Sequence, residues 1–81
     1  MKREGITVAD YIEGKRPVIE ALRAQVPLTC VLLADNVKRD GQIEDILRKA
    51  RQFGVEVKTV RRRDLDEKSE RGSHQGVMAR T

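Results

Sequence analysis

The chain has 81 residues, which is enough for one small domain with one core and one thin sheet. Seventeen Lys and Arg side chains against 13 Asp and Glu give a formal net charge of +4, which is compatible with a polyanionic partner. A single cysteine, Cys30, excludes an internal disulfide and a multi-thiolate metal site. No run approaches the roughly 20 apolar residues of a membrane span, and no signal-peptide pattern opens the chain, so we expect a cytoplasmic protein without a membrane partner.

The first part of the chain predicts a lead-in, a helix and a buried strand. Residues 1–10 carry charge without periodicity, and we interpret them as a flexible lead-in. A helix is expected from Lys15, because Pro17 suits a first helical turn and the apolar residues after it recur at i, i+3 and i+4. Pro27 is expected to end this helix. The apolar run 29–34 is typical of a central strand covered on both faces.

The second part predicts the clearest helix of the chain. Apolar residues from Ile43 to Phe53 follow the spacing of a buried stripe, with Asp40 before them as a cap and Gly54 after them at the position that ends a helix. A charged segment at 61–69 suggests a further short helix. Strands are expected at residues 11–13, 29–34, 55–60 and 76–80.

Strands and helices therefore alternate from residue 11 to the last residue. This alternation predicts a single α/β domain over residues 11–81, built as a small three-layer α/β/α sandwich with a mostly parallel four-stranded sheet.

Two common enzyme motifs do not occur in the sequence. There is no Gly-rich phosphate loop after a strand and no Gly-x-Ser-x-Gly elbow. Cys30 and His74 offer a thiol and a base, but the thiol falls in a buried strand and no third group is evident to orient the imidazole. We therefore expect no catalysis, no metal site and no cofactor in this chain alone.

The basic residues suggest an anion-binding surface. Lys15 and Arg16 fall at a helix N-terminus, where free N–H groups also attract anions, and Gly14 would let a partner approach closely. Arg61–Arg63 form a dense cluster, although the acidic residues that follow can neutralise it. Both features can also be ordinary solvated faces. Aromatic residues are only 2% of the chain, so RNA binding would depend on phosphate contacts and hydrogen bonds rather than on stacked bases.

An ordered series of motifs resembles a known family. These are Gly14 with Glu20-Ala21-Leu22, then Ala50, Gly54, Val55 and Val57, then Leu65-Asp66, and finally His74-Gln75-Gly76-Val77-Met78-Ala79. The series resembles the N-terminal substrate-binding domain of SpoU/TrmH-type RNA 2′-O-ribose methyltransferases. Residues 11–80 carry the resemblance, and it depends most on His-Gln-Gly.

The resemblance implies a fold shared with small ribosomal proteins that bind kinked RNA. It also implies a partner domain, since family members continue into a knotted catalytic domain that binds S-adenosylmethionine, and the motifs of that domain do not occur here. We therefore expect a monomeric module that positions rRNA or tRNA for methylation by that domain. A stand-alone kink-binding RNA protein and a protein-interaction module remain as alternatives, and binding that weakens steeply with salt would favour RNA over protein.

The expected RNA contacts are of three kinds. The first kind comes from the strand-to-helix turn. The second consists of basic side chains that widen the positively charged surface, and the third consists of polar groups in the turn before the last strand. His74 is expected either to hold the turn that enters the final strand or to contact RNA. Reversing the charges of Lys15 and Arg16 together should weaken RNA binding. The full set of candidates is Gly14, Lys15, Arg16, Glu20, Arg39, Arg61, Arg62, Arg63, His74 and Gln75.

Overall fold

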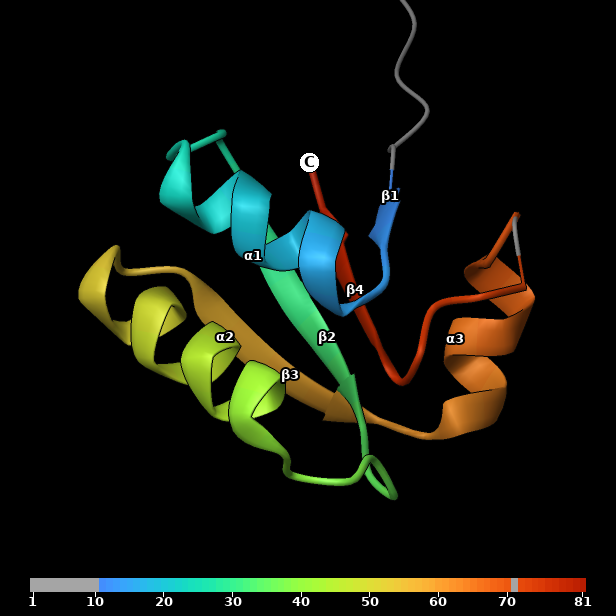
Figure 1. Ribbon diagram of the computed structural model, residues 1–81. Coiled ribbons are helices and arrows are strands. Elements are labelled where there is room, and N and C mark those ends of the chain that lie inside the picture. The colour runs from blue at the N-terminus through green and yellow to red at the C-terminus, as the bar shows by residue number, and fades with distance from the viewer. Residues whose placement is uncertain (1–10, 71) are drawn as a thin grey trace, which may run out of the picture.

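The computed structural model describes residues 11–70 and 72–81, so the lead-in expected at 1–10 lies outside the described residues. The described residues form four strands and three helices that alternate along the chain, as the sequence predicts (Figure 1). Their order is β1 (Tyr11–Glu13), α1 (Lys15–Arg23), β2 (Cys30–Ala34), α2 (Gly41–Gln52), β3 (Glu56–Val60), α3 (Arg62–Lys68) and β4 (Val77–Arg80).

The sheet is mixed, and the prediction of a mostly parallel sheet is wrong. Its strand order is β1-β4-β2-β3, and only the β2–β3 pair is parallel. Both β1 and β2 pair with β4 in the antiparallel direction, which means that β1, β2 and β3 run the same way and β4 alone runs against them. Because β4 is inserted between β1 and β2, one reversed strand makes two of the three pairings antiparallel.

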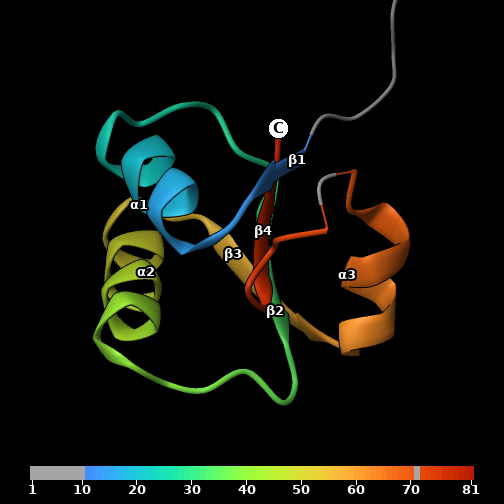
Figure 2. The ribbon, with the colours of Figure 1, turned by 45° about the vertical axis from the view of Figure 1, so that its right-hand side comes forward.

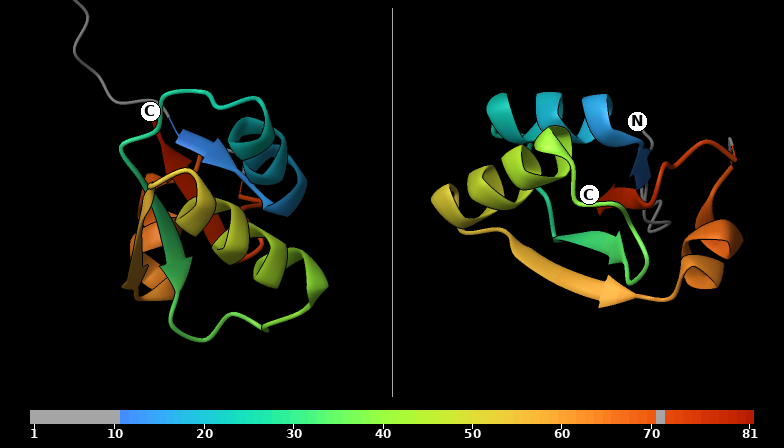
Figure 3. Two further views of the ribbon diagram at one scale, coloured as in Figure 1. Left: turned by 90° about the vertical axis from the view of Figure 1, so that its left-hand side faces the viewer. Right: turned by 60° about the horizontal axis from the view of Figure 1, so that its bottom comes forward.

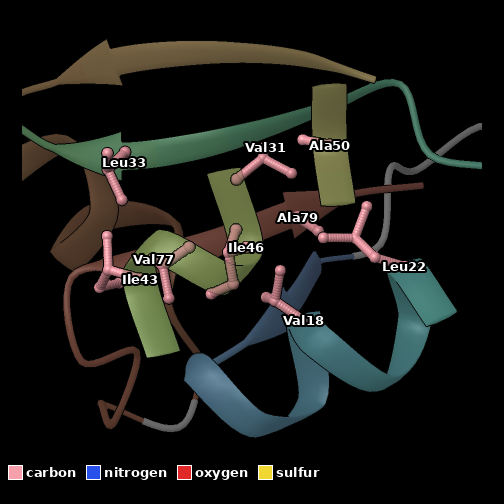
Figure 4. Close-up of a cluster of buried hydrophobic side chains, with 9 residues drawn as sticks. All are labelled: Val18, Leu22, Val31, Leu33, Ile43, Ile46, Ala50, Val77 and Ala79. Carbon is pink, nitrogen blue, oxygen red and sulfur yellow. The ribbon is translucent and has the colours of Figure 1, made fainter. Parts of the chain in front are cut away.

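The sheet separates two apolar cores, with α1 and α2 on one face and α3 on the other (Figure 2). All five residues of β2 are buried, as expected for a central strand. The larger core joins β2 and β4 to the two helices through Val18, Leu22, Val31, Leu33, Ile43, Ile46, Ala50, Val77 and Ala79 (Figure 4). The smaller core contains Cys30, Leu32, Ala34, Leu65 and Met78.

Helix α1 ends earlier than predicted. It stops at Arg23, four residues before Pro27, because Gln25 takes a left-handed conformation with a φ of 54°. The Gln25 N–H donates to the Leu22 carbonyl and the Val26 N–H to the Ala21 carbonyl, which is the hydrogen-bond pattern of a Schellman motif.

The predicted residues flank helix α2 at both ends. The Asp40 side chain accepts a hydrogen bond from the Ile43 N–H at 3.0 Å, and Gly54 follows the helix with a φ of +70°. Phe53 was expected in the buried stripe but lies beyond the end of the helix and is half-buried.

Candidate functional site

Four segments that are far apart in the sequence meet at one end of the sheet. This end is formed by the last residues of β1, β2 and β3 and the first residue of β4, because β4 runs the opposite way. The four segments are the first turn of α1, the loop at 35–40, the start of α3 and the turn at 73–76 (Figure 3, right). We call this region the basic end, defined by Lys15, Arg16, Lys38, Arg39 and Arg61–Arg63.

Backbone hydrogen bonds fix these segments to one another. The Gly14 N–H donates to the Val77 carbonyl at 3.1 Å, and the Ala34 N–H donates to the Gly76 carbonyl at 2.8 Å. The Asp35 N–H donates to the Val60 carbonyl at 2.7 Å. The geometry of the basic end is therefore set by the sheet itself.

The first turn of α1 contacts the turn that precedes β4. The Lys15 N–H donates to Oε1 of Gln75 at 2.8 Å. Gly14 is buried, and a Cβ placed there would lie 3.1 Å from the same oxygen. The space beside Gly14, which was expected to admit a partner, is thus occupied by the side chain of Gln75. Since Pro17 has no N–H, the backbone donor of the first turn that these contacts leave unused is the N–H of Arg16.

Lys15 is held inside the domain rather than being presented to solvent. Its Nζ lies 2.5 Å from Oδ2 of Asp40, and its side chain is only 19% exposed. Asp40 also caps α2 through the Ile43 N–H. The hydrogen bond from Lys15, assisted by that from the Ile43 N–H, holds the pKa of the Asp40 carboxyl below its ordinary value. This ion pair ties the start of α1 to the start of α2.

His74 is buried in the turn and uses both ring nitrogens within the domain. Its Nδ1 accepts a hydrogen bond from the Gly76 N–H at 2.9 Å, and its Nε2 lies 2.6 Å from Oδ1 of Asp66. No third group to orient the imidazole was evident from the sequence, and Asp66 is that group. The pairing of Cys30 with His74 does not occur, because Cys30 lies opposite Arg80 at the other end of the sheet.

The remaining basic side chains divide into paired and unpaired groups. Nε of Arg62 donates to Oδ1 of Asn36 at 3.1 Å. Nε of Arg39 lies 2.8 Å from Oε2 of Glu44, and Arg39 holds the pKa of that carboxyl below its ordinary value through the hydrogen bond. Within residues 11–70 and 72–81, no carboxylate forms an ion pair with the exposed side chains of Arg16, Lys38, Arg61 and Arg63.

One candidate from the sequence lies apart from the others, and several side chains of this region were not among the candidates. Glu20 lies away from the basic end, in the second turn of α1, and its carboxylate contacts Arg23. Lys38 is the missed cation, and its position beside Arg39 in the same polar loop was the available signal. Asn36 gave no local signal, and Asp66 was noted only as part of the Leu65-Asp66 motif, because both meet their partners through the fold.

Two features are absent from the described part of the chain. None of its helices has the length and apolar character needed to cross a membrane. Its His, Cys, Asp and Glu side chains form no group of three suited to a metal ion.

Comparison with known proteins identifies related chains. The sequence pattern of a family described as "RNA 2′-O ribose methyltransferase substrate binding" matches residues 11–81. Three similar proteins are named uncharacterized tRNA/rRNA methyltransferases and come from Mycolicibacterium gilvum (34% identical), Mycolicibacterium smegmatis (35%) and Mycobacterium ulcerans (36%). Each match runs over 68 residues, which is 84% of this chain and 22% of the relative. The chain therefore spans about a fifth of the length of these relatives.

Proposed function

Because the chain belongs to the family of RNA 2′-O-ribose methyltransferase substrate-binding domains, we propose that it binds structured rRNA or tRNA through the basic end. In this proposal the domain holds the RNA for 2′-O-methylation by a catalytic domain of the full-length protein, in the cytoplasm. The naming of the mycobacterial relatives as tRNA/rRNA methyltransferases supports this choice of substrate. The observation that carries the proposal is the gathering of unpaired cations from three segments at one end of the sheet.

The positions of the unpaired cations favour a phosphate backbone as the ligand. Arg16 comes from α1, Lys38 from the loop after β2, and Arg61 and Arg63 from the start of α3. Such a spread of exposed charges over several elements suits successive phosphates of a folded RNA. Lys15 and Arg62 have a different part in the proposal, because their side chains already have partners within the domain. They position α1 and α3 so that the unpaired arginines face the RNA.

The methyl donor is assigned to the remainder of the full-length protein. S-adenosylmethionine supplies an electrophilic methyl group and needs a pocket with polar groups for its adenosine and amino acid parts. Among the described residues, the buried side chains are apolar except for His74, which already has two partners. These residues do not fit S-adenosylmethionine.

The proposal is tested by reversing two unpaired charges at the basic end, Arg16→Glu with Arg63→Glu. Neither side chain has an ion-pair partner in the described residues, so the double variant should keep its fold. We expect it to bind rRNA or tRNA transcripts at least tenfold more weakly, with the slope of log affinity against log salt reduced by roughly one for each lost phosphate contact. Lys15→Glu is a poorer test, because it would place a second carboxylate beside Asp40.

A matched control reverses two cations at the other end of the sheet, Arg51→Glu with Arg80→Glu. Both side chains are exposed, and the net charge changes by the same amount as in the test variant. The control should lose much less affinity and keep most of its salt slope. Equal losses in the two double variants, or unchanged affinity in the folded test variant, would show that RNA does not bind at the basic end.

A further inference from the structure

The turn at residues 73–76 holds Gln75 in an unusual backbone conformation. Gln75 has a φ of 58°, in the left-handed region that residues with a side chain rarely adopt. Two hydrogen bonds close the turn around it, from the Gly76 N–H to Nδ1 of His74 at 2.9 Å and from the Val77 N–H to the His74 carbonyl at 3.0 Å. Gln75 is therefore placed by its neighbours rather than by its own preference.

The hydrogen bonds of His74 define which ring nitrogen carries the proton. Because Nδ1 accepts the Gly76 N–H, the proton of the neutral ring lies on Nε2 and is donated to Oδ1 of Asp66. The Asp66 side chain is 61% exposed, whereas that of His74 is 5% exposed. Asp66 thus reaches in from α3 and keeps the imidazole in the tautomer that holds the turn.

The side chain of Gln75 is oriented by a separate contact. Its Oε1 accepts the Lys15 N–H at 2.8 Å, and an amide N–H can be received only by the oxygen of a carboxamide. The Nε2 group therefore points away from α1. It belongs to an exposed residue, and no group within residues 11–70 and 72–81 accepts its hydrogens.

We propose that Gln75 donates a hydrogen bond from Nε2 to an acceptor atom of the bound RNA, and that Asp66 positions it through His74. This inference rests on the proposed function, because it places the donor at the RNA-binding end. Gln75 acts as a donor only, since its oxygen is occupied by the Lys15 N–H. Asp66 is a positioning residue and does not contact the RNA.

The variant Gln75→Glu tests the donor directly. Glutamate has the same shape and keeps an oxygen for the Lys15 N–H, and its charge suits the start of a helix, so the thermal unfolding midpoint should stay the same or rise. The donor is lost, and RNA affinity should fall by about tenfold or more. Ser73→Glu is the charge control, because it adds the same charge to an exposed residue of the same turn, and it should lose only about two- to threefold.

The pattern of the losses identifies the acceptor. A similar loss for unrelated RNA sequences indicates a phosphate or ribose oxygen, and a loss confined to one sequence indicates a base. Equal losses in Gln75→Glu and Ser73→Glu would overturn the donor role. If the Arg16 and Arg63 double variant also binds normally, the proposed RNA interface itself fails. If that double variant binds weakly while Gln75→Glu does not, only this inference fails.

The positioning role of Asp66 is tested by a pair of variants. Asp66→Ala should shift the ¹⁵N resonances of the His74 ring away from a pure Nε2–H tautomer, move the Gly76 amide resonance and weaken RNA binding. Asp66→Asn still offers an oxygen to Nε2–H and should restore all three readouts towards wild type. Unchanged ring resonances and affinity in Asp66→Ala would contradict the positioning role, as would a failure of Asp66→Asn to restore them.

Discussion

Replacing Gly76 by alanine should destabilise the domain through two separate costs. The first is conformational, because Gly76 has a φ of +86° and a residue with a Cβ costs about 1–2 kcal/mol in this region. The second is steric, because the added Cβ would lie 2.7 Å from Cγ2 of Val37 and 3.1 Å from Nη2 of Arg62. Cβ of Val37 is itself 3.2 Å away, so rotation of the valine cannot clear the space, and overpacking costs about 1–3 kcal/mol.

The sum is about 2–5 kcal/mol, which is large for a domain of this size. At about 0.05–0.15 kcal/mol per residue, 81 residues give a total stability of about 4–12 kcal/mol. Urea unfolding followed by circular dichroism measures the loss. Gly54→Ala is the matched control, since Gly54 has a similar φ of +70° but nothing within 4 Å of an added Cβ. Gly76→Ala should cost about 1–3 kcal/mol more than Gly54→Ala, and equal losses would refute the steric argument.

Two further predictions concern the elements that support the basic end. Leu65→Ala should lower the free energy of unfolding by about 2–5 kcal/mol, as measured by urea unfolding. The reason is that Leu65 is fully buried and is the residue through which α3 packs on the sheet. A decrease below about 1 kcal/mol would contradict this packing. Asp40→Asn keeps a capping side chain but loses the charge paired with Lys15. Because the pKa of Asp40 is lowered in the folded state, the ionised carboxylate adds stability to the wild-type domain above the ordinary aspartate pKa. This added stability is lost as the pH falls through the lowered pKa. The difference in urea midpoint between wild type and Asp40→Asn should therefore shrink between about pH 6 and about pH 2, and a constant difference would contradict it.

Features encoded by local sequence patterns were predictable. The continuous apolar run of β2 indicates a strand that is buried on both faces. The apolar stripe of α2 indicates a helix that is buried on one face, and both patterns are visible in the sequence. Asp40 and Gly54 are residue types that suit the two ends of α2. The end of α1 was missed because Gln25 occupies the left-handed position where glycine is the usual signal.

Features that depend on long-range contacts were not predictable. The direction of β4 is set where the turn at 73–76 joins the carboxyl ends of the other strands, through bonds such as Gly14 N–H to Val77 carbonyl. The alternation of strands and helices along the chain does not indicate in which direction β4 runs. The contacts of the site were not predictable for the same reason. Lys15 contacts Asp40, which is 25 residues away in the sequence, and Gln75, which is 60 residues away. The sequence therefore identified a basic surface but not which of its cations are already paired.

Whether RNA binds at the basic end can be observed directly by an amide NMR titration of the domain with rRNA and tRNA fragments. We expect the shift changes to cluster at the basic end, in residues 14–16, 36–40, 61–63 and 73–76, and to diminish as salt rises. We expect little change at the opposite end, in residues 25–29 and 52–55. Shift changes centred on that opposite end, or an absence of salt-dependent changes at the basic end, would show that RNA does not bind at the basic end.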